Sequence, residues 1–204
     1  APTGERIRAR AAMRLLRDHR ELRRYLAGMV LCGAPRRAAL PFAVVMMRRS
    51  MGLSDADVMR YWSGVPWTDV ARAHEMIAKD ATAMRDGEHL RLGLARTDDG
   101  ALIGTCTLFA FNAQCRRAEL GYSLVPAVWG RGYMHEALGA LLAYGFGDLA
   151  LNRVEADIDP RNTASARSLE RLGFRREGYL RERWIVADEV SDSILYGLLQ
   201  REWL

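Results

Sequence analysis

Apolar and polar residues alternate from Leu90 onward in a way that predicts paired strands. Leu90, Leu92 and Leu94 alternate with other residues, and a turn signal follows at Asp98-Asp99-Gly100. Residues 102–111 are rich in β-branched and aromatic types, which favour strands. Two such runs joined by an Asp-Gly turn predict a hairpin.

A helical pattern precedes this hairpin. Thr68-Asp69 can cap a helix, and its apolar residues fall near one face; they are Ala73, Met76, Ile77 and Met84. Three aromatic residues close to it, Tyr61, Trp62 and Trp67, can either line a cleft or belong to the core.

A strand–helix–strand unit is predicted over residues 118–158. In strand 118–125 the even-numbered residues share one face, and residues 154–158 alternate again. Between the strands, apolar residues recur at helical spacing; they are Met134, Ala137, Leu138, Leu141, Leu142 and Phe146. Such a unit normally pairs its strands in parallel with a right-handed crossover.

The last part of the chain predicts one more helix and a second hairpin. The helix begins near Asn162 and ends at Gly173, a residue type favoured just beyond a helix. Strands near 178–186 and 191–199 follow. The whole pattern predicts a mixed sheet with helices packed on it, an α/β (α+β) domain.

The net charge of +5 over 204 residues is unevenly distributed. Residues 1–50 contain twelve arginines, no lysine and three acidic residues, a net +9, so residues 51–204 carry −4. We divide the chain into a basic, atypical segment 1–50 and a domain 51–204. The segment can be a basic arm for nucleic acid, an Arg-rich targeting sequence, or an extension with no function of its own.

The apolar runs, the cysteines and the histidines of the chain argue against a membrane-spanning protein and against a structural metal site. No apolar run approaches the roughly 18 residues that a membrane-spanning helix needs. Cys32, Cys106 and Cys115 show no metal-binding spacing, and the four histidines are scattered, so we expect no metal and a reducing, cytoplasmic setting.

A glycine turn between a strand and a helix is the strongest chemical signal. The sequence Trp129-Gly130-Arg131-Gly132-Tyr133-Met134 lies between strand 118–125 and its helix. Free N–H groups at a helix N-terminus bind phosphate, so this turn predicts a phosphorylated ligand. It lacks the third glycine of a dinucleotide fingerprint and the Gly-Lys-Ser/Thr of a Walker loop.

Several segments in the same order resemble the GNAT superfamily of acetyl-CoA-dependent N-acetyltransferases. They are residues 119–122, 129–134, 136–138, 152–156, Asn162 with Ser165, 169–174 and 177–178. The order and the residues of these segments are most similar to the branch that acetylates the N-terminal amine of ribosomal proteins. The similarity covers about residues 54–204. The resemblance implies a mostly antiparallel sheet with one parallel strand–helix–strand unit that forms the CoA site.

The resemblance also implies which residues bind acetyl-CoA. The loop from Trp129 to Met134 would bind the pyrophosphate through its backbone, with Arg131 adding a cation. Leu124 and Val125 would pair with the pantetheine arm, and one of their N–H groups would stabilise the oxyanion. Asn162 would bind the arm from the other side; a plain helix cap is the alternative, and one residue could do both.

Catalysis needs a neutral amine and a protonated leaving thiol. Many members of the family have a tyrosine seven residues after the asparagine, but this chain has Leu169 there. By resemblance Ser165 would serve the thiol, and Glu119 is the candidate base; a solvated serine and a salt-bridged glutamate are the alternatives. Tyr122 is a residue of the core or cleft wall in this interpretation.

The sequence therefore predicts an N-acetyltransferase that uses acetyl-CoA, without a metal, to modify a primary amine, most simply a protein N-terminus. A small amine or aminoglycoside-like acceptor and a non-catalytic CoA-binding module are the alternatives. We expect no membrane partner, nucleic acid only through residues 1–50, and a monomer or homodimer.

Overall fold

A computed structural model describes residues 56–62, 64, 79–80, 82–84, 86–96 and 99–203 of the chain. The basic segment 1–50, Trp67 and the helix cap at Thr68-Asp69 lie outside the described residues. Within the predicted helix that follows that cap, residues 79–80 and 82–84, Met84 among them, are helical.

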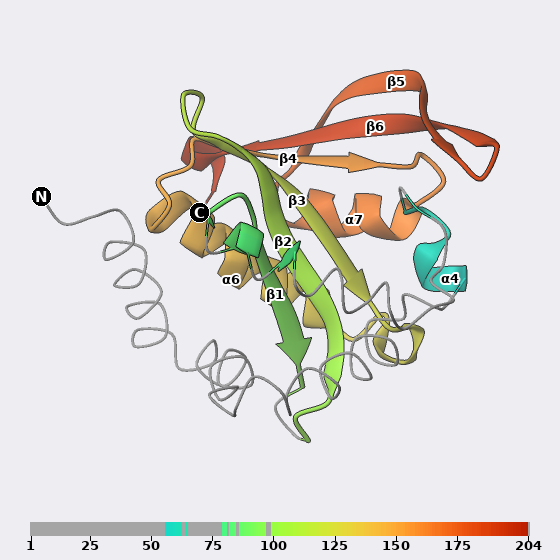
Figure 1. Ribbon diagram of the computed structural model, residues 1–204, viewed down its shortest axis with the longest axis horizontal. Helices are drawn as coiled ribbons and strands as arrows, with labels where there is room; N and C mark the ends of the chain where they lie inside the picture. Colours follow the sequence, from blue (N-terminus) through green and yellow to red (C-terminus); the bar gives the residue numbers. More distant parts are fainter. Residues whose placement is uncertain are drawn as a thin grey trace, which may run out of the picture.

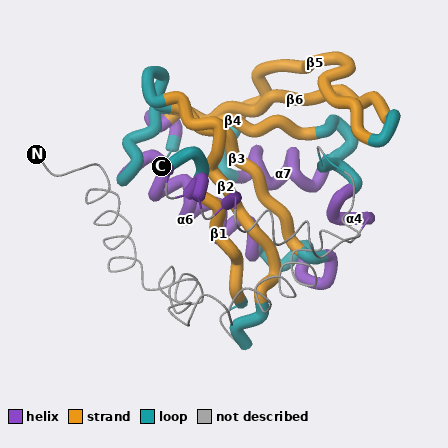
Figure 2. Tube along the Cα trace, in the orientation of Figure 1, coloured by secondary structure: helices purple, strands orange, loops and turns teal. Residues whose placement is uncertain are grey.

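In the described part of the chain, six strands form one sheet, and helices connect and cover them (Figures 1 and 2). The elements in chain order are α4 (Ala56–Met59), β1 (Leu90–Ala95), β2 (Leu102–Asn112), β3 (Arg117–Leu124), η1 (Pro126–Val128), α6 (Tyr133–Gly147), β4 (Arg153–Ile158), α7 (Thr163–Arg171), β5 (Arg175–Val186), β6 (Glu189–Leu199) and η2 (Gln200–Glu202).

The strand order is β1-β2-β3-β4-β6-β5, with β3 and β4 as the parallel pair and the other pairs antiparallel. This confirms the predicted mixed sheet, both hairpins and the parallel strand–helix–strand unit. The described β strands agree with the predictions to within a few residues.

The core lies between the sheet and the helices α6 and α7. Alternate residues of β3 and β4, such as Ala118 and Val154, are fully buried there, and so are Leu138 of α6 and Leu169 of α7. Leu169, which stands where many family members have tyrosine, therefore serves packing. Burying each such leucine or valine side chain is worth about 1.5–3 kcal/mol.

The last hairpin extends further than the sequence indicates. β5 begins at Arg175 and β6 at Glu189, so only Ala187 and Asp188 form the turn. Both residues have positive φ, 47° and 67°, as the commonest two-residue hairpin turns require. The sequence predicted these strands near 178–186 and 191–199, so the observed turn is shorter than expected.

Candidate active site

The two glycines of the predicted ligand loop adopt backbone conformations that other residues avoid. Gly130 has φ 73° and Gly132 has φ 86°. A Cβ placed on either glycine would have no heavy atom within 4 Å. Glycine is therefore required at these positions by the positive φ of the backbone and not by a lack of space for a side chain. The space above the loop is open to a ligand.

The loop leads into the N-terminus of α6, where backbone N–H groups are available. Gly132 is the N-cap of α6 and has no side chain that could form a capping hydrogen bond. The N–H of Glu136 donates the first hydrogen bond of the helix, to the carbonyl oxygen of Gly132. The N–H groups of the first turn before Glu136 have no intrahelical partner. Arg131 is exposed beside them, while Met134 is buried and anchors the helix in the core.

The parallel strands β3 and β4 pair only at their beginnings. Their register runs from Arg117 opposite Arg153 to Glu119 opposite Glu155 and then stops. Beyond it the two strands point apart, which Figure 1 shows plainly. The edge of β3 from Leu120 to Leu124 therefore has no neighbouring strand on that side.

Backbone groups of Leu124 and Tyr122 point into this gap. The N–H of Val125 donates to the carbonyl oxygen of Ile103 on β2, at 2.9 Å. Because backbone groups alternate in direction along a strand and β3 pairs regularly with β2 here, the N–H groups of Leu124 and Tyr122 face the opposite edge. Of the two predicted residues, Leu124 is the one whose N–H faces the gap.

Trp129 links the loop to the end of β3. Its indole N–H donates to the carbonyl oxygen of Leu124 at 2.8 Å, although about half of its surface is exposed. The sequence interpretation gave Trp129 a backbone role only. Its side chain in fact fixes the loop next to the gap.

Asn162 is the N-cap of α7. Its side-chain oxygen accepts from the N–H of Ser165 at 3.1 Å, which satisfies one N–H of the helix N-terminus. The cap interpretation is confirmed. Because the oxygen is used, the amide NH₂ is the group with which Asn162 can still donate to a ligand.

Tyr122 connects β3 to the same turn of α7. Its hydroxyl donates to the carbonyl oxygen of Ser165 at 3.3 Å, and burial raises the pKa of Tyr122 to about 12. The structure thus brings together three residues that are distant in sequence, Tyr122, Asn162 and Ser165. The apolar face of the strand gave no signal for this hydrogen bond.

Glu119 lies on the opposite face of the sheet, near the point where β3 and β4 part. Burial raises the pKa of its carboxyl group, and repulsion from Glu155 and Asp157 raises it further against the attraction of Arg117 and Arg183. A raised pKa brings a carboxylate closer to the range in which it can accept a proton from an amine.

Within the described residues, no group of three or more His, Cys, Asp or Glu side chains is arranged to hold a metal. In the same part of the chain, no helix is long and apolar enough to cross a membrane.

These features fit CoA. The open space over Gly130 and Gly132 and the free N–H groups of α6 suit a pyrophosphate, and the unpaired edge of β3 suits the amide groups of the pantetheine arm.

Comparisons with known proteins agree with this fit. The family model described as "Acetyltransferase (GNAT) domain" matches residues 43–175. An uncharacterized N-acetyltransferase, p20 of Bacillus licheniformis, is 36% identical over 165 residues, which cover 76% of this chain and 93% of the relative. The [ribosomal protein uS5]-alanine N-acetyltransferase of Escherichia coli is 29% identical over 58% of this chain and 62% of the relative.

A solved structure shows the same fold. Spermidine N-acetyltransferase from Vibrio cholerae, in complex with CoA and spermine, superposes with a TM-score of 0.68 at 22% identity, covering 83% of this chain and 94% of that one. The family match, the sheet topology and the loop agree with one another. The chain belongs to the GNAT acetyltransferase family and is an acetyl-CoA-dependent N-acetyltransferase.

Proposed function

We propose that the chain transfers the acetyl group of acetyl-CoA to the N-terminal α-amine of a protein. The observation that carries this proposal is the parting of β3 and β4 beside the glycine loop and the N-terminus of α6, with Glu119 on one face of the gap and Ser165 on the other side.

Each residue of the site has a role in this proposal. The backbone from Trp129 to Met134, with Arg131, holds the pyrophosphate. Leu124 and Val125 border the pantetheine arm, and Asn162 donates its side-chain NH₂ to that arm. Acetyl-CoA supplies the acetyl group as a reactive thioester.

Proton transfers follow from the positions of Glu119 and Ser165. Glu119 takes a proton from the acceptor ammonium, directly or through a water, so that the neutral amine forms the new C–N bond. The N–H of Leu124 stabilises the oxyanion as the thioester carbonyl is attacked. Ser165 donates a hydrogen bond or proton to the sulfur as the C–S bond breaks.

The choice of a protein N-terminus is supported by the ribosomal-protein relative and by the resemblance of the site segments to that branch. The spermidine enzyme shares the fold, so a small amine is the competing acceptor. A module that binds CoA without turnover is the second alternative.

A panel of acceptors tests this proposal. Free thiol release from acetyl-CoA is followed with peptides beginning with alanine or serine, with the same peptides blocked by N-terminal acetylation, and with spermidine. We expect thiol release with the unblocked peptides and none above background with the blocked ones. Faster turnover of spermidine would favour the small-amine acceptor, and CoA binding without thiol release from any acceptor would favour the binding module.

A further inference from the structure

Four charged side chains form a continuous row of ion pairs across the sheet. Arg117 of β3 donates to Oε2 of Glu155 on β4, and Nε of Arg153, also on β4, donates to Oε1 of Glu155 at 2.7 Å. The two Nη groups of Arg153 donate to the two carboxylate oxygens of Glu177 on β5. This ion-pair row, Arg117–Glu155–Arg153–Glu177, therefore links β3, β4 and β5.

A glycine on β6 makes room for the ion-pair row. β6 lies between β4 and β5, and Gly197 of β6 is the register partner of Glu155. A Cβ on Gly197 would lie 2.6 Å from Nη2 of Arg153 and 2.6 Å from Oε1 of Glu177, closer than Cβ atoms come to other heavy atoms. The guanidinium of Arg153 thus lies directly against the backbone of β6.

Glu155 is held in one position by the row. Each of its two oxygens accepts a charge-assisted hydrogen bond from a different arginine, Arg117 or Arg153. A glutamate side chain without such partners would turn toward solvent and away from a nearby negative charge. Because the two arginines prevent this movement, the negative charge of Glu155 stays where it is.

The fixed charge lies opposite Glu119, the proposed base. Glu119 and Glu155 are register partners in the parallel pair of β3 and β4, so their side chains share one face of the sheet. Neighbouring strands are about 4.8 Å apart. Arg117, two residues before Glu119 on the same face, donates its hydrogen bond to Glu155. The proposed base therefore faces a carboxylate on the next strand.

Four charged side chains act on the carboxyl group of Glu119. Burial is the largest cause of its raised pKa, followed by repulsion from Glu155 and then from Asp157, both on β4. Arg117 on β3 and Arg183 on β5 lower the pKa. Among these four charges, Glu155 has the largest effect.

We propose that Glu155 is a positioning residue for the reaction: held by Arg117 and Arg153, it keeps a negative charge opposite Glu119 and makes that carboxylate a better acceptor for the proton of the substrate amine. This inference rests on the proposed function, in which Glu119 is the base, and adds a residue that acts through Glu119. A carboxylate next to a second negative charge holds a proton more firmly, so it takes one more readily from an ammonium group.

A titration of the Glu119 carboxyl group by NMR tests the inference without any turnover. The variant Glu155→Gln keeps the length of the side chain, removes its charge and leaves the charge of Arg117 without its partner. Both changes favour the ionised form of Glu119, so we expect its pKa to be lower in the variant than in the wild type. A pKa that is unchanged or higher would overturn the inference.

A second variant, Arg117→Gln, should shift the titration in the opposite direction. It removes an attraction to Glu119, while Arg153 still holds Glu155 in place, so the pKa of Glu119 should rise. A general disturbance of the sheet would move the titration in the same direction in both variants. That outcome would contradict the inference.

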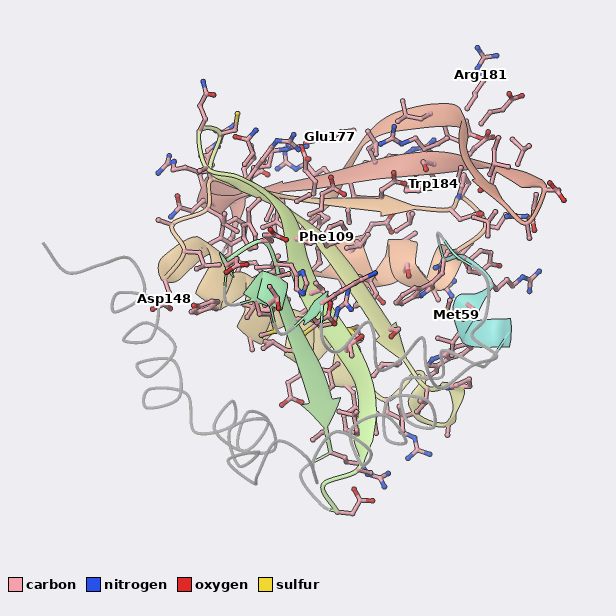
Figure 3. The ribbon with its side chains drawn as sticks, viewed as in Figure 1. Met59, Phe109, Asp148, Glu177, Arg181 and Trp184 are labelled. Carbon is pink, nitrogen blue, oxygen red and sulfur yellow. The ribbon has the colours of Figure 1, made fainter. Side chains whose placement is uncertain are left out.

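The matched control is Glu177→Gln, the same change of charge at the end of the row that is paired with Arg153. Figure 3 shows Glu177 and Trp184 toward opposite ends of β5. Glu177 is not among the charges that shift the pKa of Glu119, so we expect the wild-type titration. Equal shifts in Glu155→Gln and Glu177→Gln would overturn the inference.

Kinetics separate this inference from the proposed function. In Glu155→Gln, kcat/KM should begin to rise at a lower pH than in the wild type, and kcat should fall less than about tenfold, since a weaker base still accepts the proton. The Kd for CoA should stay unchanged. A shifted Glu119 titration with an unshifted kcat/KM profile, or absence of turnover in the wild type, would contradict the proposed function, whereas an unshifted titration contradicts the inference alone.

Discussion

The hydroxyl of Tyr122 donates a hydrogen bond to the carbonyl oxygen of Ser165, which joins the unpaired edge of β3 to the first turn of α7. The bond spans the two elements between which the proposed CoA site lies. It holds the turn that carries Ser165 at a defined distance from Leu124.

Removing this hydrogen bond with Tyr122→Phe should lower kcat about three- to tenfold, because Ser165 would lose its fixed position next to the sulfur. Stability should fall by about 1 kcal/mol, the usual cost of one hydrogen bond. Steady-state kinetics and thermal unfolding measure the two effects. In a Ser165→Ala background the change at Tyr122 should have little further effect on kcat, and fully additive losses would show that Tyr122 does not act through Ser165.

Glu119→Gln should lower kcat about a hundredfold if this carboxylate is the base. In the wild type, kcat/KM should increase as the pH rises through the raised pKa of Glu119, since only the ionised carboxylate accepts a proton. The variant should lack this increase in kcat/KM. The increase that comes from deprotonation of the acceptor amine should be the same in both proteins. A variant with the same pH profile as the wild type would show that Glu119 is not the base.

The raised pKa of Glu119 also affects the pH dependence of stability. A folded-state pKa above the unfolded value means that the folded protein binds this proton more tightly, so the contribution of Glu119 to stability falls as pH rises through the interval between the two values. Glu119→Gln removes that cost. At neutral pH the variant should be at least as stable as the wild type, and a lower unfolding temperature would show that the carboxylate has a structural partner.

Replacing the loop glycines should weaken CoA binding without disturbing the packing of the core. Gly130→Ala and Gly132→Ala force a side chain into the left-handed region, which costs about 1–2 kcal/mol each. We expect the Kd for CoA to rise at least tenfold by calorimetry, since the strained loop can no longer direct its N–H groups at the pyrophosphate. The control Gly139→Ala lies inside α6 with open space around it and should raise stability by about 0.5–1 kcal/mol without changing the Kd.

Gly104 differs from the loop glycines because the space around it is filled. A Cβ on Gly104 would overlap the carbonyl oxygen of Ser123 and lie 3.1 Å from Cα of Leu124, both backbone atoms of β3. Gly104→Ala should therefore destabilise the protein by about 1–3 kcal/mol and weaken CoA binding through the displaced Leu124. Wild-type stability in denaturant titrations would show that the two strands separate at little cost.

The elements that position the site were predictable because their patterns are local. The alternation in 118–124, the helical spacing from Met134 to Phe146 and the terminating Gly173 each follow from the geometry of one element. The parallel pairing followed from the length of the crossover.

Contacts between distant elements could not be predicted in this way. The alternation of β4 places Asp157 on the outer face, but it does not identify Leu195 as its partner or bring Ser193 next to it. Likewise, the bond from Trp129 to Leu124 depends on the path of the chain after Pro126. Such contacts depend on register and chain direction, which single-sequence patterns leave open.

A peptide with an alanine N-terminus and an internal lysine, incubated with the protein and acetyl-CoA, distinguishes acetylation of an α-amine from acetylation of a side chain. Fragmentation by mass spectrometry locates any acetyl group that the peptide gains. We expect one acetyl group on the α-amine, formed in equal amount to the free thiol. Acetylation of the lysine side chain alone, or no acetylation of the peptide while CoA still binds, would contradict the proposed function.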